Sequence, residues 1–282
     1  MTTQPHEYHR PEDWASAAAA LNEPGRSASP LTIPPRVPAE PYAGVEAVVD
    51  LSRLGLDAIR QTDGAIELGV LVPLQDLVDA PWRHDAAAGI LSQAAHLAAH
   101  PGLRHLASVG GVVSAQAGPP EVLLALLALD AAAVLSGTRG GRTTEPLAKY
   151  LARPGAPAGK LLVGVSFTPP APHAAGALAR VARTPRDEAI VAAAAVLVVE
   201  DGVCRRARVC LAGAGVSPRR SPAAEALLVG RALTAERLAQ AAQAAPGKMA
   251  FASDLRGSAA YRQAMAAVVA RRSLNGAWKA LS

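Results

Sequence analysis

Apolar and polar positions in the first hundred residues predict a mixture of helices and strands. Residues 11–21 read as a helix, with Pro11 near its first turn and Glu12 and Asp13 at its positive end. Residues 22–44 hold too many prolines for a regular helix or a central strand, which predicts a stiff, extended loop. Residues 45–80 alternate short apolar runs around a Thr-Asp-Gly turn, as in a hairpin followed by a short helix. Residues 84–103 have the spacing of an amphipathic helix that a Pro-Gly pair ends.

The pattern of apolar and polar positions alternates between helical and strand-like segments up to residue 282, and it predicts an α+β protein of two domains. A buried helix is expected from residue 121, then strands at 131–137 and 159–167. A proline-rich connector follows, and we place the domain boundary near Pro169 to His173, giving domains 5–170 and 174–282. Residues 187–221 predict a helix or buried strand, then strands around a Glu-Asp-Gly turn. Helices are expected at 234–245 and 258–274, with Ser258 as the cap of the second.

Composition narrows the class of function. Half of the residues are apolar, yet aromatic residues make up only 3%, so stacking platforms for bases are scarce. The net charge of +5 comes from scattered arginines without the dense basic stripe of a nucleic-acid binder, so no nucleic-acid partner is expected. The first residues lack the pattern of a signal peptide, and the longest apolar runs are too short for a membrane span. We therefore expect a cytoplasmic chain.

The sequence gives no support to a metal centre. Cys204 and Cys210 are six residues apart in a segment that reads as a strand, where even spacing puts both on one face. They form no CxxC motif, so neither a disulfide framework nor an iron–sulfur or zinc site is indicated. His96 and His100 are four residues apart on a predicted helix and could share a metal, but no carboxylate or cysteine on that helix completes a ligand set. A structural role for these histidines is preferred, and we expect no metal in this chain.

One glycine pair suggests a phosphate site. In RHLASVGGVVSAQAGPPEV, residues 104–122, Gly110 and Gly111 follow the hydroxyl residue Ser108 and lead into an apolar segment. Backbone N–H groups can converge on an anion where no Cβ atoms intervene, so the pair fits either a phosphate loop or an ordinary turn.

Several segments together resemble one family, the FAD-binding (medium) subunits of carbon monoxide dehydrogenase, xanthine dehydrogenase and related molybdenum hydroxylases. Their order and spacing carry the resemblance, which runs from YHRPEDWASAAAAL through VVDLSRL and the glycine pair to GVCRRARVCLAGAGVSPRRS and DLRGSAAYRQAMAAVVARRSL. The resemblance implies an FAD-binding domain of the vanillyl-alcohol oxidase type, with two lobes that divide near residue 52, followed by a smaller α+β carboxy-terminal domain. It also implies partner subunits with iron–sulfur clusters and molybdopterin, in a dimer of heterotrimers that passes electrons through FAD to an external acceptor.

The resemblance also assigns site residues. No catalytic residue is assigned, and the residues expected to bind FAD are Arg104, Ser108, Val109, Gly110, Gly111, Glu121 and Asp187. Three contact positions depart from the family. The family has glycine where this chain has Ala107, asparagine where it has Val112, and aspartate where it has Glu121. The resemblance also places Leu178 and Ala179 where the family has an aromatic residue or lysine beside the flavin. It further implies that Tyr261 and Arg262 pack between the domains.

The first flavin loop of the family, which reads like Ala-Gly-Gly-Thr-Asp-Leu, has no counterpart here. Residues 27–40 contain no glycine, and their prolines lack N–H donors: Pro30, Pro34, Pro35 and Pro38. Two hypotheses follow. Either FAD is still bound, with other amides and arginines such as Arg36 or Arg104 compensating, or the chain is a flavin-free structural or docking subunit of the same kind of complex.

Overall fold

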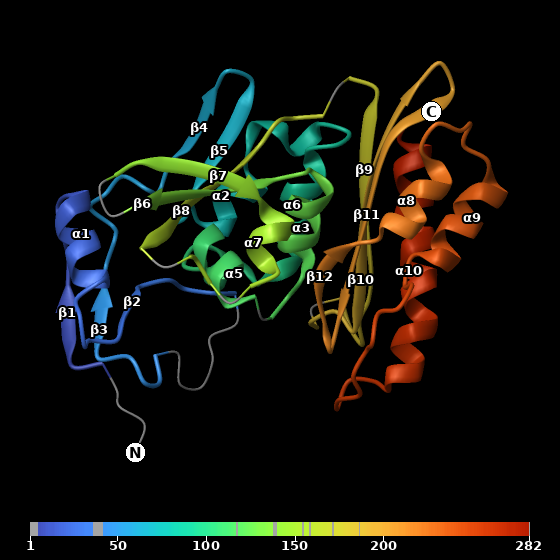
Figure 1. Ribbon diagram of the computed structural model, residues 1–282. Helices are drawn as coiled ribbons and strands as arrows, with labels where there is room; N and C mark the ends of the chain where they lie inside the picture. Colours follow the sequence, from blue (N-terminus) through green and yellow to red (C-terminus); the bar gives the residue numbers. More distant parts are fainter. Residues whose placement is uncertain are drawn as a thin grey trace.

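The computed structural model describes residues 5–35, 42–116, 118–137, 140–153, 155–157, 159–170, 172–185 and 187–281. Three sheets follow one another along the molecule, and they divide the described chain into a first lobe, a second lobe and a carboxy-terminal unit (Figure 1). The predicted α+β class is confirmed. No helix among these residues is both long and apolar enough to cross a bilayer.

The first lobe is a small parallel sheet covered by one helix. Its strands are β1 (Glu7–His9), β2 (Ala28–Pro30) and β3 (Ala47–Val49), in the order β1-β3-β2. Helix α1 (Trp14–Leu21) begins later than the sequence suggests, because the Asp13 side chain caps it by accepting from the Ser16 amide. Strand β2 falls in the segment expected to be a loop; Pro30 is tolerated there because β2 is an edge strand.

The second lobe is an antiparallel sheet packed against helices. Its strands, in spatial order, are β4 (Ile59–Thr62), β5 (Ala65–Gly69), β8 (Lys160–Phe167), β6 (Ala132–Gly137) and β7 (Arg142–Pro146). The predicted Thr-Asp-Gly hairpin is confirmed, since Asp63 and Gly64 both have positive φ between β4 and β5. The helical segments are α2 (Leu74–Val78), η1 (Pro81–His84), α3 (Gly89–Ala98), α4 (Pro101–Arg104), α5 (Val109–Ala115), α6 (Glu121–Ala128) and α7 (Leu147–Leu151).

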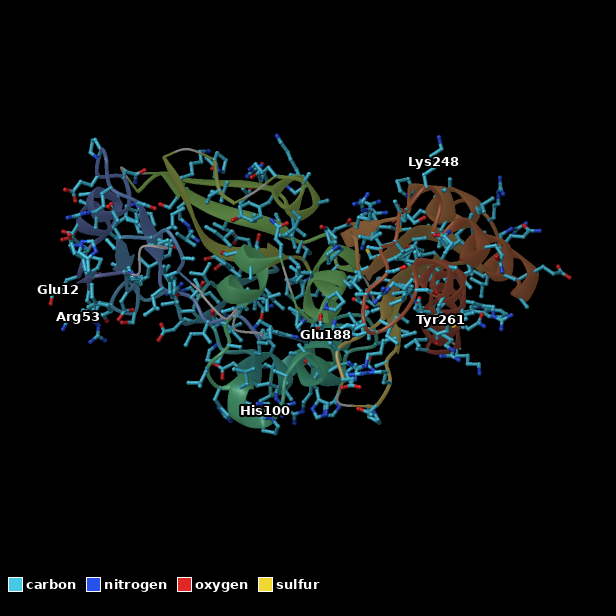
Figure 2. All side chains as sticks on the ribbon, turned by 90° about the horizontal axis from the view of Figure 1, so that it is seen from below. Glu12, Arg53, His100, Glu188, Lys248 and Tyr261 are labelled. Carbon is cyan, nitrogen blue, oxygen red and sulfur yellow. The ribbon has the colours of Figure 1, made fainter. Side chains whose placement is uncertain are left out.

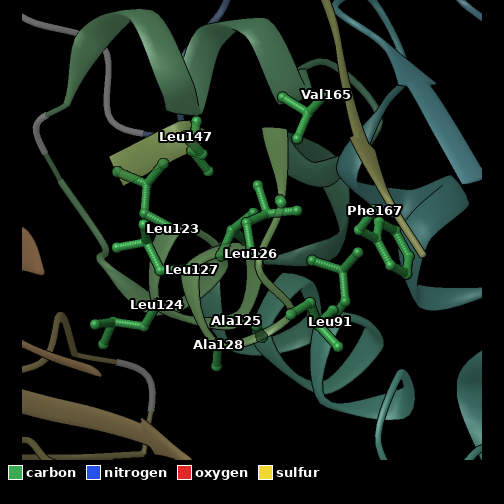
Figure 3. Packing of buried hydrophobic residues seen from close by; sticks show 14 of the residues in the cluster. Leu91, Leu123, Leu124, Ala125, Leu126, Leu127, Ala128, Leu147, Val165 and Phe167 are labelled. Atoms are coloured by element: carbon green, nitrogen blue, oxygen red, sulfur yellow. The ribbon is translucent and has the colours of Figure 1, made fainter. Parts of the chain in front are cut away.

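Helix α6 is the centre of this lobe. All eight of its residues are buried, and its leucines pack beside Leu91 of α3 and Phe167 of β8 (Figure 3). The Pro-Gly pair at 101–102 does not simply end α3; it opens the short helix α4, which His100 caps. The sequence pattern therefore located these helices well and misjudged only the turn between them.

The carboxy-terminal unit is an antiparallel sheet in the order β12-β11-β10-β9, with helices on one face (Figure 1). Its strands are β9 (Ala174–Val181), β10 (Val191–Glu200), β11 (Val203–Gly213) and β12 (Val216–Arg220), and its helices are α8 (Pro222–Leu228), α9 (Ala235–Ala244) and α10 (Ala259–Lys279). Of the two alternatives left open for residues 187–200, the buried strand is the correct one. Ser258 caps α10 as predicted.

Strand β10 is buried on both faces. Ala192, Ala194 and Val196 belong to the core shared with the second lobe, whereas Ala193 and Ala195 belong to the core under α10. Small side chains let α6 and α10 approach this strand closely from opposite sides. The carboxy-terminal sheet therefore separates two hydrophobic cores.

Two predictions about side chains in this unit are wrong. Cys204 and Cys210, both free, lie in different cores, because a bulge in β11 shifts the register by one residue and reverses the alternation. Tyr261 is exposed rather than packed between domains. The guanidinium of Arg262 is buried within the carboxy-terminal unit, where it donates to carbonyl oxygens of Ile190, Ala252 and Gly257 and pairs with Asp254 at 2.6 Å.

Candidate functional site

The second glycine-rich loop, Ser108–Gly111, forms the start of α5. The Ser108 hydroxyl caps this helix by accepting from the Gly111 amide at 3.1 Å. The amides of Ser108, Val109 and Gly110 donate to the carbonyl oxygens of Ile33 (2.9 Å), Val72 (3.0 Å) and Val70 (2.7 Å). Every N–H group of this loop therefore has a protein acceptor.

The first loop, Leu31–Pro35, lies directly against the second. Its Leu31 amide donates to the Val49 carbonyl at 2.8 Å, and its Thr32 amide donates to the Tyr42 hydroxyl at 3.1 Å. Pro34 and Pro35 carry no N–H group. Ile33 is thus the one residue of this loop whose amide has no acceptor among the residues that the structure describes. Arg36 and Pro38, also considered for this site, lie outside the described residues.

Gly110 and Gly111 make room for protein backbone. A Cβ atom on Gly111 would stand 2.2 Å from the Ile33 carbonyl oxygen, and one on Gly110 would stand 2.8 Å from the Val70 carbonyl oxygen. Both distances are far below van der Waals contact. The two loops and the end of β5 require these glycines whether or not a ligand is present.

Three hollows border the loop pair, and one of them, of about 790 Å³, is lined by Pro35, His96, His100, Arg104 and Asp187 among others. A cavity of about 270 Å³ between the two lobes is lined by Trp14, Thr32, Gly110, Ser114 and Lys160 among others, and the indole of Trp14 closes one wall by donating to the Gly137 carbonyl at 2.7 Å. Lys160, the one cation among the described residues of its lining, donates to the Thr143 hydroxyl at 2.9 Å.

On its other side the loop pair borders an acidic hollow. Three carboxylates line that hollow together with Ile33 and Ser108: Asp50, Asp57 and Asp76. Burial raises the pKa of Asp76, and its neighbour Asp79 adds to the effect. Among the described residues, the backbone amides of the two loops do not supply the converging donors that a pyrophosphate needs, so the loops do not fit that group of FAD.

The remaining predicted contacts come together through an arginine that sequence reasoning missed. Arg180 of β9 donates to the Glu121 carboxylate at 3.0 Å and to the Asp187 carbonyl at 3.0 Å, and its guanidinium also donates to the Pro185 carbonyl. It thereby ties α6 of the second lobe to the β9–β10 turn. A lone arginine in the otherwise apolar stretch GALARV is the signal that could have drawn attention to it.

Glu121 is a buried carboxylate with one free oxygen. Its side chain is fully buried, Oε1 accepts from Arg180, and Oε2 has no partner among the described residues. Burial raises the pKa of Glu121, and the hydrogen bond and charge of Arg180 oppose that shift only in part. An ionised Glu121 therefore costs free energy in the folded chain.

Replacing Glu121 with glutamine is expected to flatten the pH dependence of stability. Because its folded-state pKa lies above the ordinary value of 4.5, the folded chain binds more protons than the unfolded chain just above pH 4.5, so stability falls as the pH rises from there. Glu121→Gln removes this loss and retains an acceptor for Arg180. Urea unfolding at several pH values should show the variant gaining on the parent between pH 4.5 and neutrality. The control Glu12→Gln changes an exposed ion pair with Arg53 (Figure 2), and its stability should depend on pH as that of the parent does. The same pH dependence of stability in all three chains would contradict the raised pKa of Glu121.

The turn after β9 is polar and partly exposed. Arg183 pairs with Asp187, one of the residues expected to bind FAD, at 3.2 Å. Leu178 and Ala179 instead sit within β9 opposite Ala194 and Ala193 and pack into the two cores. Glu188, which follows Asp187, lies at the boundary between the second lobe and the carboxy-terminal unit (Figure 2) and pairs with Arg256 at 2.6 Å.

The histidines of α3 and α4 have structural partners. Arg104, buried, donates to His96 Nδ1 at 2.9 Å and to Gln75 Oε1 at 3.0 Å, so it braces α2 and α3, and it lines one hollow together with Pro35 of the first loop. His100, labelled in Figure 2, caps α4 through the Leu103 amide. Among the described residues, no three His, Cys, Asp or Glu side chains are grouped as metal ligands.

Comparisons with known proteins match both halves of the chain. The model described as "FAD binding domain in molybdopterin dehydrogenase" matches residues 4–170, and the one described as "CO dehydrogenase flavoprotein C-terminal domain" matches residues 176–277. A carbon monoxide dehydrogenase medium chain of Afipia carboxidovorans is 31% identical over 280 residues, covering 96% of each chain. The alpha subunit of the 6-hydroxypseudooxynicotine dehydrogenase complex of Paenarthrobacter nicotinovorans is 33% identical over 233 residues, covering 80% of this chain and 78% of that one.

The solved structures agree over the whole length. A chain from carbon monoxide dehydrogenase of Hydrogenophaga pseudoflava, in a form that lacks the Mo-pyranopterin moiety of its molybdenum cofactor, superposes with a TM-score of 0.88 at 28% identity, and all of both chains is covered. Quinoline 2-oxidoreductase from Pseudomonas putida 86 shares the fold, with a TM-score of 0.84 at 22% identity.

Proposed function

We propose, from the premise that this chain belongs to the family of FAD-binding medium subunits of molybdenum hydroxylase-type complexes, that it docks on an iron–sulfur subunit and a molybdopterin subunit of one oxidoreductase complex. The observation that carries the proposal is the superposition of the complete chain, both lobes and the carboxy-terminal unit, on a carbon monoxide dehydrogenase chain. In complexes of this family the cofactors are FAD, iron–sulfur clusters and molybdopterin, and the last two are bound by partner subunits.

Two finer roles fit this place in the complex. In the first, FAD bound to this chain accepts electrons from the partner's clusters and passes them to an external acceptor. In the second, the chain is a flavin-free structural or docking subunit. The occupied amides of Ser108–Gly111 and the two prolines of Leu31–Pro35 favour the second role, because an anion would find few donors there.

The proposal also includes the organisation expected from the sequence. The domains are residues 5–170, with two lobes dividing near residue 52, and residues 174–282. The complex is a dimer of heterotrimers in the cytoplasm. In the relay role, the seven residues that the resemblance assigned to FAD contact the flavin nucleotide. In the docking role, the same residues only stabilise the packing of the chain.

Isolation of the chain from its own cells tests the proposal. A tag on this chain should bring down two further subunits, one with the absorbance of iron–sulfur clusters and one that contains molybdenum. Size-exclusion chromatography with light scattering then measures the mass of the complex against that of a dimer of heterotrimers. Recovery of the tagged chain alone at every ionic strength tried would contradict the proposal.

A further inference from the structure

We infer that the chain itself closes the pyrophosphate position of its FAD-binding domain, so that it enters its complex without holding FAD. The inference rests on the proposed function and deepens it, because it selects the docking role over the relay. Three independent observations carry it: the use of the backbone donors, the contact between the two loops, and the charges beside them.

The backbone donors of both loops are engaged. A dinucleotide pyrophosphate is held by several N–H groups that point at its oxygens, and each must be free of other acceptors. In Ser108–Gly111 all four amides donate to protein oxygens at 2.7–3.1 Å. In Leu31–Pro35 two residues are prolines and two amides are engaged, which leaves that of Ile33. A single N–H group cannot form a convergent anion site.

The contact between the loops is direct and tight. The Ile33 carbonyl oxygen accepts from the Ser108 amide at 2.9 Å and lies 2.2 Å from the point where a Cβ of Gly111 would stand. The space that the glycine leaves open is therefore taken by a carbonyl oxygen, whose partial negative charge repels phosphate. The Pro34 nitrogen lies 2.8 Å from the same point, and its ring keeps this backbone fixed.

Side chains do not replace the missing donors. On one side the loop pair borders Asp50, Asp57 and Asp76, which oppose an anion. On the other side Lys160 is the one cation that the described part of the chain places in the cavity lining, and a single lysine supplies a point charge rather than the several fixed donors that a pyrophosphate site uses. In the third hollow, which Pro35 borders, Arg104 is already engaged, since it donates to His96 and to Gln75.

The native complex provides the first test. Acid precipitation of the complex isolated with this chain, followed by fluorescence of the supernatant, should release no flavin while iron and molybdenum are present. Release of about one FAD per chain would overturn the inference. Failure to recover the partner subunits would count against the proposed function alone, since the full-length chain can still be titrated with FAD by itself.

Restoring donors provides the second test. The double substitution of Pro34 and Pro35 by glycine returns two N–H groups beside Gly111, and each hydrogen bond to a phosphate oxygen is worth roughly tenfold in affinity. We expect no saturable FAD binding by the parent chain or by Pro24→Gly, a matched change in an exposed loop, and saturable FAD binding by the double variant. Saturable binding of FAD by the parent, or a double variant that folds as the parent does and gains nothing, would overturn the inference.

Discussion

Gly111→Ala should lower the free energy of unfolding by about 3 kcal/mol, although alanine is the better helix former. The new Cβ would stand 2.2 Å from the carbonyl oxygen and 2.5 Å from the carbonyl carbon of Ile33, and backbone atoms cannot turn aside as a flexible side chain can. Relief would require the first loop to move away from the second, which would break the Ser108–Ile33 hydrogen bond. Urea unfolding followed by circular dichroism measures the loss.

Gly141→Ala is the matched control, because a Cβ there meets no atom within 4 Å and its φ is not in the left-handed region. It should change stability by no more than about 0.5 kcal/mol. Equal unfolding midpoints for Gly111→Ala and the parent would show that the loops are not in firm contact. A stable Gly111→Ala chain that loses flavin instead would assign the glycine to ligand binding.

Arg180→Met is expected to cost about 3–5 kcal/mol at neutral pH, because it leaves Glu121 ionised and buried without a partner. The same change removes donors from the carbonyl oxygens of Pro185 and Asp187, so the β9–β10 turn loses its tie to α6. Most of the loss should disappear as the pH is lowered and Glu121 becomes protonated. Burial raises the pKa of Glu121 and therefore favours its neutral form. Denaturant unfolding at two pH values separates these contributions.

Two further chains make the experiment decisive. Arg183→Met removes the exposed partner of Asp187 and should cost less than about 1 kcal/mol. The double variant of Glu121→Gln and Arg180→Met should recover part of the loss, because the uncompensated charge is gone. A loss for Arg180→Met that is independent of pH and unchanged in the double variant would contradict a role for the ion pair.

Local signals in the sequence were sufficient for most elements. The buried helix at Glu121, the hairpin at Asp63 and the cap at Ser258 follow from periodicity and turn chemistry, and the structure has all three. The resemblance through both ends of the chain gave the family. The helix, the hairpin and the cap depend on short stretches of chain, so they can be predicted from a single sequence.

Features that depend on distant partners could not be predicted in this way. The bulge that separates Cys204 from Cys210 and the pair that Arg180 makes with Glu121, 59 residues away, are set by packing between elements. The two glycines of Ser108–Gly111 were located correctly, yet their sequence cannot tell whether phosphate or protein occupies the space beside them. The position of the Ile33 carbonyl answers this, and nothing near Gly111 in sequence indicates it.

The prolines of the first loop have a consequence for how the complex is assembled. A glycine-rich phosphate loop loses much conformational entropy when it becomes ordered, and the ligand commonly offsets that cost. Pro34 and Pro35 restrict the unfolded chain instead, each by roughly 0.4–1 kcal/mol of entropy that need not be lost on folding. The loop is therefore already ordered before any small molecule arrives, and we expect this subunit to be ready for its partners as soon as it has folded.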